Sequence, residues 1–142
     1  MPHVKVMIHL VWSTKNRQPF LASSEVRRKV WKHIKDNAAQ KGIFIDMING
    51  YNDHCHCLVS LGIEQSLSNI LRLLKGESSY WINKNGLCSS KFEWQEEYFA
   101  ISVSEKILPA VRDYIRNQED HHQIKTFSEE YDLLMKEFGL KN

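Results

Sequence analysis

Long apolar runs are missing from this 142-residue chain, which holds only three cysteines, three prolines and six glycines. No stretch approaches the roughly 18 consecutive apolar residues of a membrane helix, and the first residues lack the charged and apolar layout of a secretory signal. An odd number of cysteines gives no disulfide framework, and Cys55 and Cys57 are too near each other on one extended segment to be joined without strain. We therefore expect a cytoplasmic protein with reduced thiols and no membrane partner.

A strong excess of either charge is also absent, since the formal net charge is +2. The charges are unevenly placed: residues 1–50 hold nine Lys and Arg against three Asp and Glu, and the rest of the chain holds ten against fourteen. The basic N-terminal half could meet phosphates, although a solvated helix face explains any single lysine as well. The chain is 42% hydrophobic, which is enough to form the core of a single domain over residues 1–142.

Hydrophobic periodicity predicts an alternation of strands and helices. Between Val4 and Trp12 every second residue is apolar, which is typical of a half-buried strand. The next elements are a helix from Ser23 or Ser24 to Gly42, a hairpin of strands over 43–48 and 54–61, a helix over 66–83 and a strand over 93–103. This order predicts an α+β fold of the ferredoxin-like, split βαβ type, in which an antiparallel sheet has both helices on one face and the other face available for ligands.

Two more helices are expected after this core of about residues 1–104. Pro109 suits the first turn of a helix over about 109–122, and Thr126 with Glu129 forms a capping box for a last helix over about 127–138. The residues expected to be buried by the last helix are Tyr131, Leu134, Met135 and Phe138.

His54 and His56 alternate with Cys55 and Cys57 along a predicted strand, so the two imidazoles lie on one face and the two thiols on the other. Since the thiol face carries the apolar residues of the core, both imidazoles should face away from it and can bind one divalent cation between them. The same alternation disfavours a zinc site built from all four side chains. A pair of solvated surface histidines is the plain alternative.

The first of the two C-terminal helices can supply an oxygen ligand to such a cation. Tyr114 and Gln118 are four residues apart, so a phenol and a carboxamide project from one face about one turn apart. Without the histidines, a packing tyrosine and a solvent-facing amide would explain both residues. His121 and His122 are weaker ligand candidates, and His9 is interpreted as a residue of the sheet surface rather than as a ligand.

Five segments together resemble single-tyrosine HUH transposases, the group that comprises small insertion-sequence transposases and REP-associated tyrosine transposases. They are HLVWSTKNR at residues 9–17, HCHCLVS at 54–60, LKGESSYWIN at 74–83, WQEEYFAISVS at 94–104 and VRDYIRNQEDHH at 111–122. The resemblance covers most of the chain in order. In the family, a hydrophobic residue separates the two histidines, and Cys55 fills that position here.

The resemblance implies a metal-dependent transposase that nicks and rejoins single-stranded DNA through a 5′-phosphotyrosine. Carried over by position, Tyr114 is the nucleophile, and His54, His56 and Gln118 hold Mg²⁺ or Mn²⁺. The resemblance further implies DNA with a hairpin as the substrate, and a homodimer in which Tyr114 of one subunit can complete the active site of the other.

Basic residues supply candidate contacts to the DNA backbone, four of them from the exposed face of the first helix. These candidates are Lys15, Arg17, Arg27, Arg28, Lys32, Lys35 and Lys75. A non-catalytic nucleic-acid-binding module of the same topology is an alternative, but no strand carries the aromatic-rich signature that RNA-binding sheets use to stack bases. A zinc-stabilised structural domain is a second alternative, and it predicts unfolding by chelators.

Overall fold

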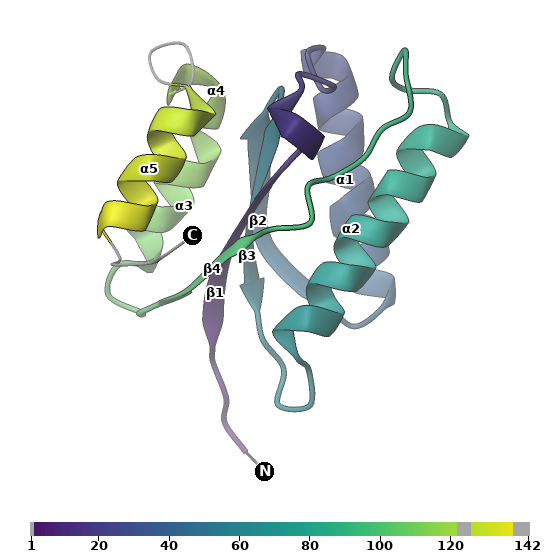
Figure 1. The fold of residues 1–142 in the computed structure, drawn as a ribbon. Helices are drawn as coiled ribbons and strands as arrows, with labels where there is room; N and C mark the ends of the chain where they lie inside the picture. The colour runs from purple at the N-terminus through teal and green to yellow at the C-terminus, as the bar shows by residue number, and fades with distance from the viewer. Residues whose placement is uncertain (1, 122–125, 138–142) are drawn as a thin grey trace.

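A computed structural model describes residues 2–121 and 126–137 and contains one four-stranded sheet with helices on both faces (Figure 1). In chain order, the elements are β1 (Met7–Ser13), the 3₁₀ helix η1 (Lys15–Arg17), α1 (Ser24–Gln40), β2 (Phe44–Tyr51), β3 (His54–Ser60), α2 (Leu67–Lys84), β4 (Phe99–Val103), α3 (Leu108–Arg116), α4 (Gln118–His121) and α5 (Phe127–Glu137). Within these residues, no helix has both the length and the apolar character that crossing a bilayer requires.

The sheet has the strand order β2-β3-β1-β4, and every neighbouring pair is antiparallel. β2 and β3 form the predicted hairpin, while α1 and α2 each connect strands that are not neighbours. This is the split βαβ arrangement of the ferredoxin-like fold, so the predicted fold class is confirmed.

One face of the sheet packs against α1 and α2 (Figure 1). Alternate residues of the two central strands enter this core, where Leu10 of β1 and Cys55 of β3 are fully buried. They meet apolar side chains that recur along one stripe of α1, among them Val30 and Ile34. The amphipathic pattern in the sequence therefore determines which side of α1 covers the sheet.

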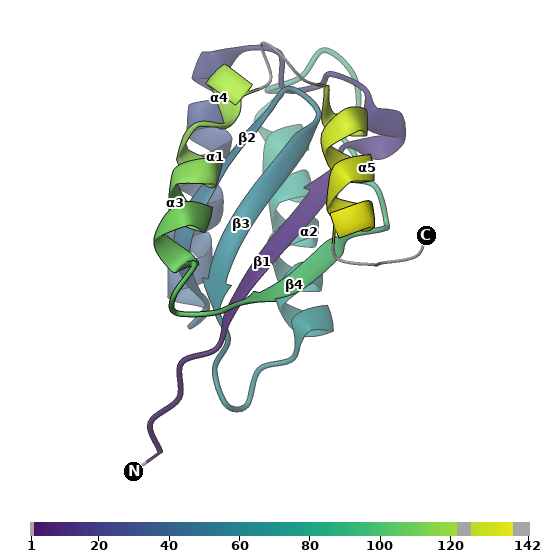
Figure 2. The same cartoon turned by 90° about the vertical axis from the view of Figure 1, so that its left-hand side faces the viewer.

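The opposite face carries the three C-terminal helices (Figure 2). α3 and α4 contact β2, and α5 packs on β1 and β4, where Phe127 forms a buried cluster with Val11 and Phe99. All seven residues of β1 are consequently buried, although the sequence pattern indicated a half-buried strand. The face that was expected to be available for ligands is thus partly covered by α3, α4 and α5.

The three cysteines are free thiols, as expected. Burial raises the pKa of Cys55 and Cys57 well above the ordinary value of a thiol, because a thiolate loses its hydration in the core. Both residues are therefore uncharged packing residues.

Several predicted boundaries differ from the observed ones. β1 begins at Met7 rather than Val4, and β4 begins at Phe99 rather than residue 93, because Trp94 turns into the core and donates a hydrogen bond to Ser78 Oγ over 2.9 Å. The helix predicted over 109–122 is broken at Asn117, whose φ of −97° and ψ of 22° end α3. Its successor α4 starts at the next residue.

The capping box predicted for the last helix is present in α5. The backbone N–H of Glu129 donates to Thr126 Oγ1 over 3.2 Å, and the Glu129 carboxylate accepts from the Thr126 backbone. Tyr131 is half-buried as expected. The side chains of Leu134 and Met135 and the whole of Phe138 lie outside the described part of the chain.

Two glycines give opposite predictions for stability. A Cβ at Gly50 would lie 2.2 Å from the carbonyl oxygen of His54 and 3.0 Å from the Trp31 ring, whereas a Cβ at Gly76 in α2 would meet nothing within 4 Å. Gly50→Ala should lower the free energy of unfolding by about 1 to 3 kcal/mol through overpacking. Gly76→Ala should raise it by about 0.5 to 1 kcal/mol, since glycine disfavours a helix interior. Urea denaturation measures both, and equal midpoints for the two variants would contradict the close packing at Gly50.

Candidate functional site

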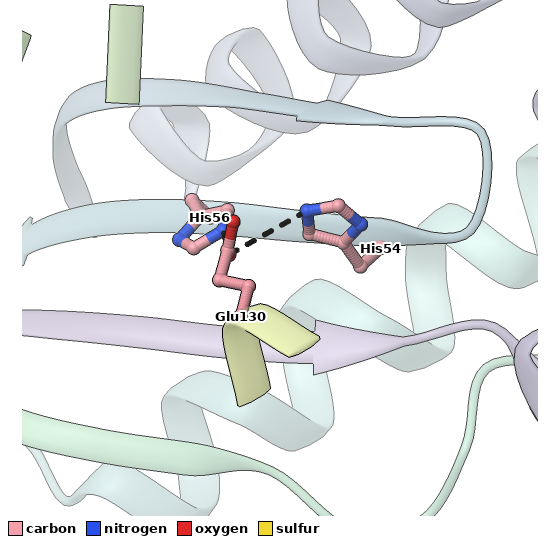
Figure 3. A group of neighbouring side chains, drawn as sticks. All are labelled: His54, His56 and Glu130. Carbon is pink, nitrogen blue, oxygen red and sulfur yellow. Dashed lines mark hydrogen bonds and ion pairs between the residues drawn. The ribbon is translucent and has the colours of Figure 1, made fainter. Parts of the chain in front are cut away.

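His54 and His56 lie on the face of β3 that is turned away from the α1 and α2 core, as the alternation predicted (Figure 3). Neither residue has any exposed surface, so the alternative of two solvated surface histidines is wrong. Their ring centroids are 5.1 Å apart. Buried imidazoles require hydrogen-bond partners, and these come from four different parts of the chain.

Glu130 of α5 reaches into the site from above the sheet (Figure 3). Its Oε1 lies 2.5 Å from His56 Nε2 and 3.8 Å from His54 Nε2, and the carboxylate is buried. The three residues offer ligand atoms that all lie within 4.8 Å of one another, which fits a site for a divalent metal ion.

Glu130 was missed in the sequence, although a signal was present. It lies between Phe127 and Tyr131, which pack α5 against the sheet, so an acidic residue falls on the buried stripe of an amphipathic helix. A buried carboxylate is rare unless it is paired or binds a metal.

Gln118, at the start of α4, supplies a second oxygen. Its Oε1 is 3.1 Å from His54 Nε2, and its Nε2 donates to the backbone carbonyl of Tyr114 over 3.3 Å. The residue is completely buried rather than solvent-facing. The break at Asn117 therefore leaves the predicted pairing of Tyr114 and Gln118 intact, because the carboxamide still points back across one turn.

Asp53 and His9 orient the two imidazoles. Asp53 Oδ1 lies 2.8 Å from His54 Nδ1, so the Nδ1–H can donate a hydrogen bond to it and leave Nε2 directed toward Gln118 and Glu130. His9 Nε2 lies 2.9 Å from Nδ1 of His56, and this contact in turn directs His56 Nε2 at Glu130.

His9 itself is a buried residue, which the sequence reading as a sheet-surface histidine did not anticipate. The ring is 5% exposed and stacks on His56 with a centroid distance of 5.1 Å. Burial, together with the neighbouring His56, lowers the pKa of His9 to about 3, while Glu130 acts in the opposite direction. A neutral His9 can accept a hydrogen bond from His56 Nδ1 at its Nε2.

Tyr114 of α3 lies against the histidines from the side of β2. Its ring meets His56 edge to face at a centroid distance of 5.5 Å, and meets His9 in the same way at 6.3 Å. Tyr114, Gln118 and both strand histidines are thus close together within one chain. The side chain of His121 and the whole of His122 lie outside the described part.

Arg27 is not on the exposed face of α1, and this expectation was wrong. Its guanidinium is buried, donates to the carbonyl oxygens of Leu21 and Ala22, and forms an ion pair of 2.9 Å with Glu119 of α4. The guanidinium carbon also lies 4.9 Å from the ring centroid of Tyr51, the last residue of β2, so these contacts are all internal.

The other predicted basic residues are more accessible. Arg28, Lys32 and Lys35 are exposed on α1, and Arg28 lines a hollow with Arg116. Lys15 pairs with Glu93 over 2.9 Å and remains exposed. Burial lowers the pKa of the half-buried Lys75, which donates to the carbonyl oxygen of Glu96. Arg17 is exposed and lies over aromatic rings of α5.

Comparisons with known proteins identify the family of this chain. A family model described as IS200-like transposase matches residues 3–118. The ISDra2 transposase TnpA of Deinococcus radiodurans is 30% identical over 118 residues, which cover 79% of this chain and 83% of that protein.

Two solved structures share the fold. A transposase candidate from Deinococcus radiodurans R1 matches with a TM-score of 0.64 and 24% identity, covering 82% of this chain and 93% of that one. A REP-associated tyrosine transposase bound to a REP hairpin matches with a TM-score of 0.63 and 17% identity, covering 86% of this chain and 72% of that one. With a family match over most of its length and a histidine pair beside a helix-borne tyrosine, this protein belongs to the IS200-like transposases, of the HUH tyrosine type.

Proposed function

We propose that this protein is a metal-dependent transposase that nicks and rejoins single-stranded DNA, with Tyr114 as the nucleophile. The observation that carries the proposal is the convergence, within one chain, of the Tyr114 ring with the paired histidines and two side-chain oxygens. The hairpin substrate is proposed from the family resemblance and from the REP hairpin bound by the structural relative.

The donor set suits a hard divalent cation, Mg²⁺ or Mn²⁺. His54 and His56 offer Nε2 atoms, and Gln118 and Glu130 offer oxygens at 3.1 Å and 2.5 Å from them. We propose these four residues as its ligands, of which Glu130 is new to the expected set. A cation bound there supplies Lewis-acid stabilisation of the charge that develops on the scissile phosphate.

The chemistry of the chain itself centres on the Tyr114 phenol. A phenol has an ordinary pKa of about 10 and is a weak nucleophile at neutral pH until the charge that develops in the reaction is stabilised. In the proposed step its oxygen forms a bond to the scissile phosphorus as the bond from phosphorus to the 3′ oxygen breaks. The phenol proton leaves to water, and the departing 3′ oxygen takes up a proton. The products are a 5′-phosphotyrosine and a free 3′-hydroxyl.

Rejoining is the reverse of this step. The 3′-hydroxyl oxygen of another strand bonds to the phosphorus and loses its proton to water, while the bond from phosphorus to the Tyr114 oxygen breaks. The Tyr114 oxygen then takes up a proton, and the new phosphodiester is complete. Because the covalent link preserves the energy of the original phosphodiester, no nucleotide cofactor is required. The sheet histidines remain oriented throughout by Asp53 and His9, which hold their Nδ1 atoms.

The two alternatives fit the site less well. An RNA-binding module of this topology stacks bases on an open sheet face, whereas α3, α4 and α5 cover that face here. A zinc site using the thiols of β3 is also disfavoured, since Cys55 and Cys57 lie in the core on the other face and are protonated.

Tyr114→Phe should abolish the covalent protein–DNA adduct on denaturing gels while hairpin DNA is still bound, because only the nucleophilic oxygen is lost and the ring packing on His56 is kept. EDTA should stop adduct formation by the wild type without unfolding it. Tyr80→Phe, at an exposed position of α2, is the matched control and should react normally. An adduct that persists in Tyr114→Phe would exclude Tyr114 as the nucleophile.

Glu130→Gln should weaken Mn²⁺ binding about tenfold or more, since it removes the only full negative charge among the proposed ligands. Titration followed by Mn²⁺ electron paramagnetic resonance measures the affinity independently of activity. Glu129→Gln removes a charge from the same turn of α5 but touches only the capping box, so its affinity should equal that of the wild type. Equal affinities for both variants would remove Glu130 from the ligand set.

Cis or trans use of the tyrosine is tested by mixing two inactive variants. We propose that Tyr114 acts on the histidines of its own chain, the arrangement in which its ring contacts His56. A mixture of Tyr114→Phe with His56→Ala should therefore form no adduct. If the mixture regains adduct formation, a subunit with an intact tyrosine serves the intact histidines of its partner, and the homodimer shares its sites.

A further inference from the structure

A cavity of about 320 Å³ opens beside the histidine site, where the end of β1, η1, the segment before β4 and α5 meet. The lining residues that matter here are Arg17, Gln95, Glu97, Tyr98, Phe127 and Tyr131. Phe127 belongs to both places, because its ring also stacks on His54 with a centroid distance of 4.1 Å and an interplanar angle of 18°. The ring of Phe127 therefore lies between the cavity and His54, one of the proposed metal ligands.

Planar groups dominate the walls. The guanidinium carbon of Arg17 lies 5.4 Å from the centroid of Phe127 and 5.2 Å from that of Tyr131. Tyr98, another lining residue, is 46% exposed. Unpaired bases of nucleic acids are bound by stacking on aromatic rings and on guanidinium planes. The cavity offers both kinds of surface.

The backbone holds Arg17 in a preformed position. Asn16 and Arg17 have φ angles of 55° and 54°, a left-handed conformation that asparagine tolerates but that is uncommon for arginine. The backbone N–H of Asn16 donates to Gln95 Oε1 over 3.1 Å, and that of Gln95 donates to Ser13 O over 2.8 Å. Local backbone strain that the surroundings maintain is concentrated at binding sites.

The charges on the walls distinguish a base from a phosphate. Glu97 is an exposed carboxylate on the lining and repels a phosphate, but it can accept a hydrogen bond from the exocyclic amino group of a base. Arg17 supplies a positive charge at the rim for the backbone that leads away from the base. The volume is at the lower end of the roughly 300 to 1,000 Å³ of small-molecule sites, which suits a single base.

We infer that this cavity holds one unpaired nucleobase of the substrate strand, next to the phosphate at the histidine site. The inference rests on the proposed function and extends it, because a base held here fixes which phosphate reaches Tyr114. The subsite thus contributes to the choice of cleavage position, independently of the hairpin.

A first experiment separates the base from the phosphate. The wild-type protein is titrated with dCMP and, in parallel, with 2-deoxyribose 5-phosphate, and amide shifts are followed by nuclear magnetic resonance. dCMP should shift the amides of Asn16, Arg17, Gln95 and Tyr98, and the sugar phosphate should leave them unmoved. Equal shifts with both compounds would overturn the inference, because they would identify a phosphate site.

A second experiment measures the affinity of a fluorescein-labelled single-stranded dC octamer in the Tyr114→Phe background, where no cleavage occurs. Tyr98→Ala should weaken binding about tenfold, the magnitude typical for loss of one stacking partner. Tyr80→Ala is closely matched, since Tyr80 is also exposed and also lies under a lysine, with Lys84 Nζ at 5.8 Å where Tyr98 has Lys75 Nζ at 6.0 Å. It should bind like the parent.

The outcomes distinguish this inference from the proposed function. If Tyr98→Ala and Tyr80→Ala bind equally well while the wild type forms its adduct, the base subsite is wrong and the transposase chemistry stands. If Tyr98→Ala alone loses affinity while the wild type forms no adduct, the subsite is supported and the nucleophile assignment fails.

Discussion

The structure depends on the burial of two imidazoles on the side of β3 that faces away from the α1 and α2 core. His54 and His56 have no exposed surface, and a buried polar group without hydrogen bonds destabilises a protein by about 1 to 3 kcal/mol. Their four ring nitrogens accordingly have partners from β1, from the turn before β3, from α4 and from α5. The C-terminal helices are therefore as much a part of the fold as of the site.

Along β3, core residues and site residues alternate between the two faces of the sheet. Cys55 and Cys57 point into the core, where burial keeps them protonated, and the neighbouring imidazoles point to the other face. A shift of register by one residue would exchange the two sets. Gly50, opposite Cys55 in the hairpin, allows the close approach of the strands that maintains this register.

Local sequence patterns were sufficient to predict the fold class and which side chains lie on each face of the sheet. They also predicted that Tyr114 and Gln118 lie together, and the two residues remain in contact although the helix ends at Asn117. Contacts between distant segments were not accessible in this way. Glu130 is 74 residues from His56, and the turn before β3 gave no sign that Asp53 would orient His54. For the same reason the internal ion pair of Arg27 with Glu119 was missed.

α5 contacts both the histidine site and the neighbouring cavity. Phe127 packs on His54, Glu130 meets His56, and Tyr131 supports Arg17 at the rim of the neighbouring cavity. All three belong to a segment beyond residue 118, where the family match ends. Since one helix contacts the proposed ligands and the proposed base subsite together, any change in how α5 docks alters both at once. In this chain, the proposed ligands His54 and His56 are therefore contacted by a helix that lies outside residues 3–118.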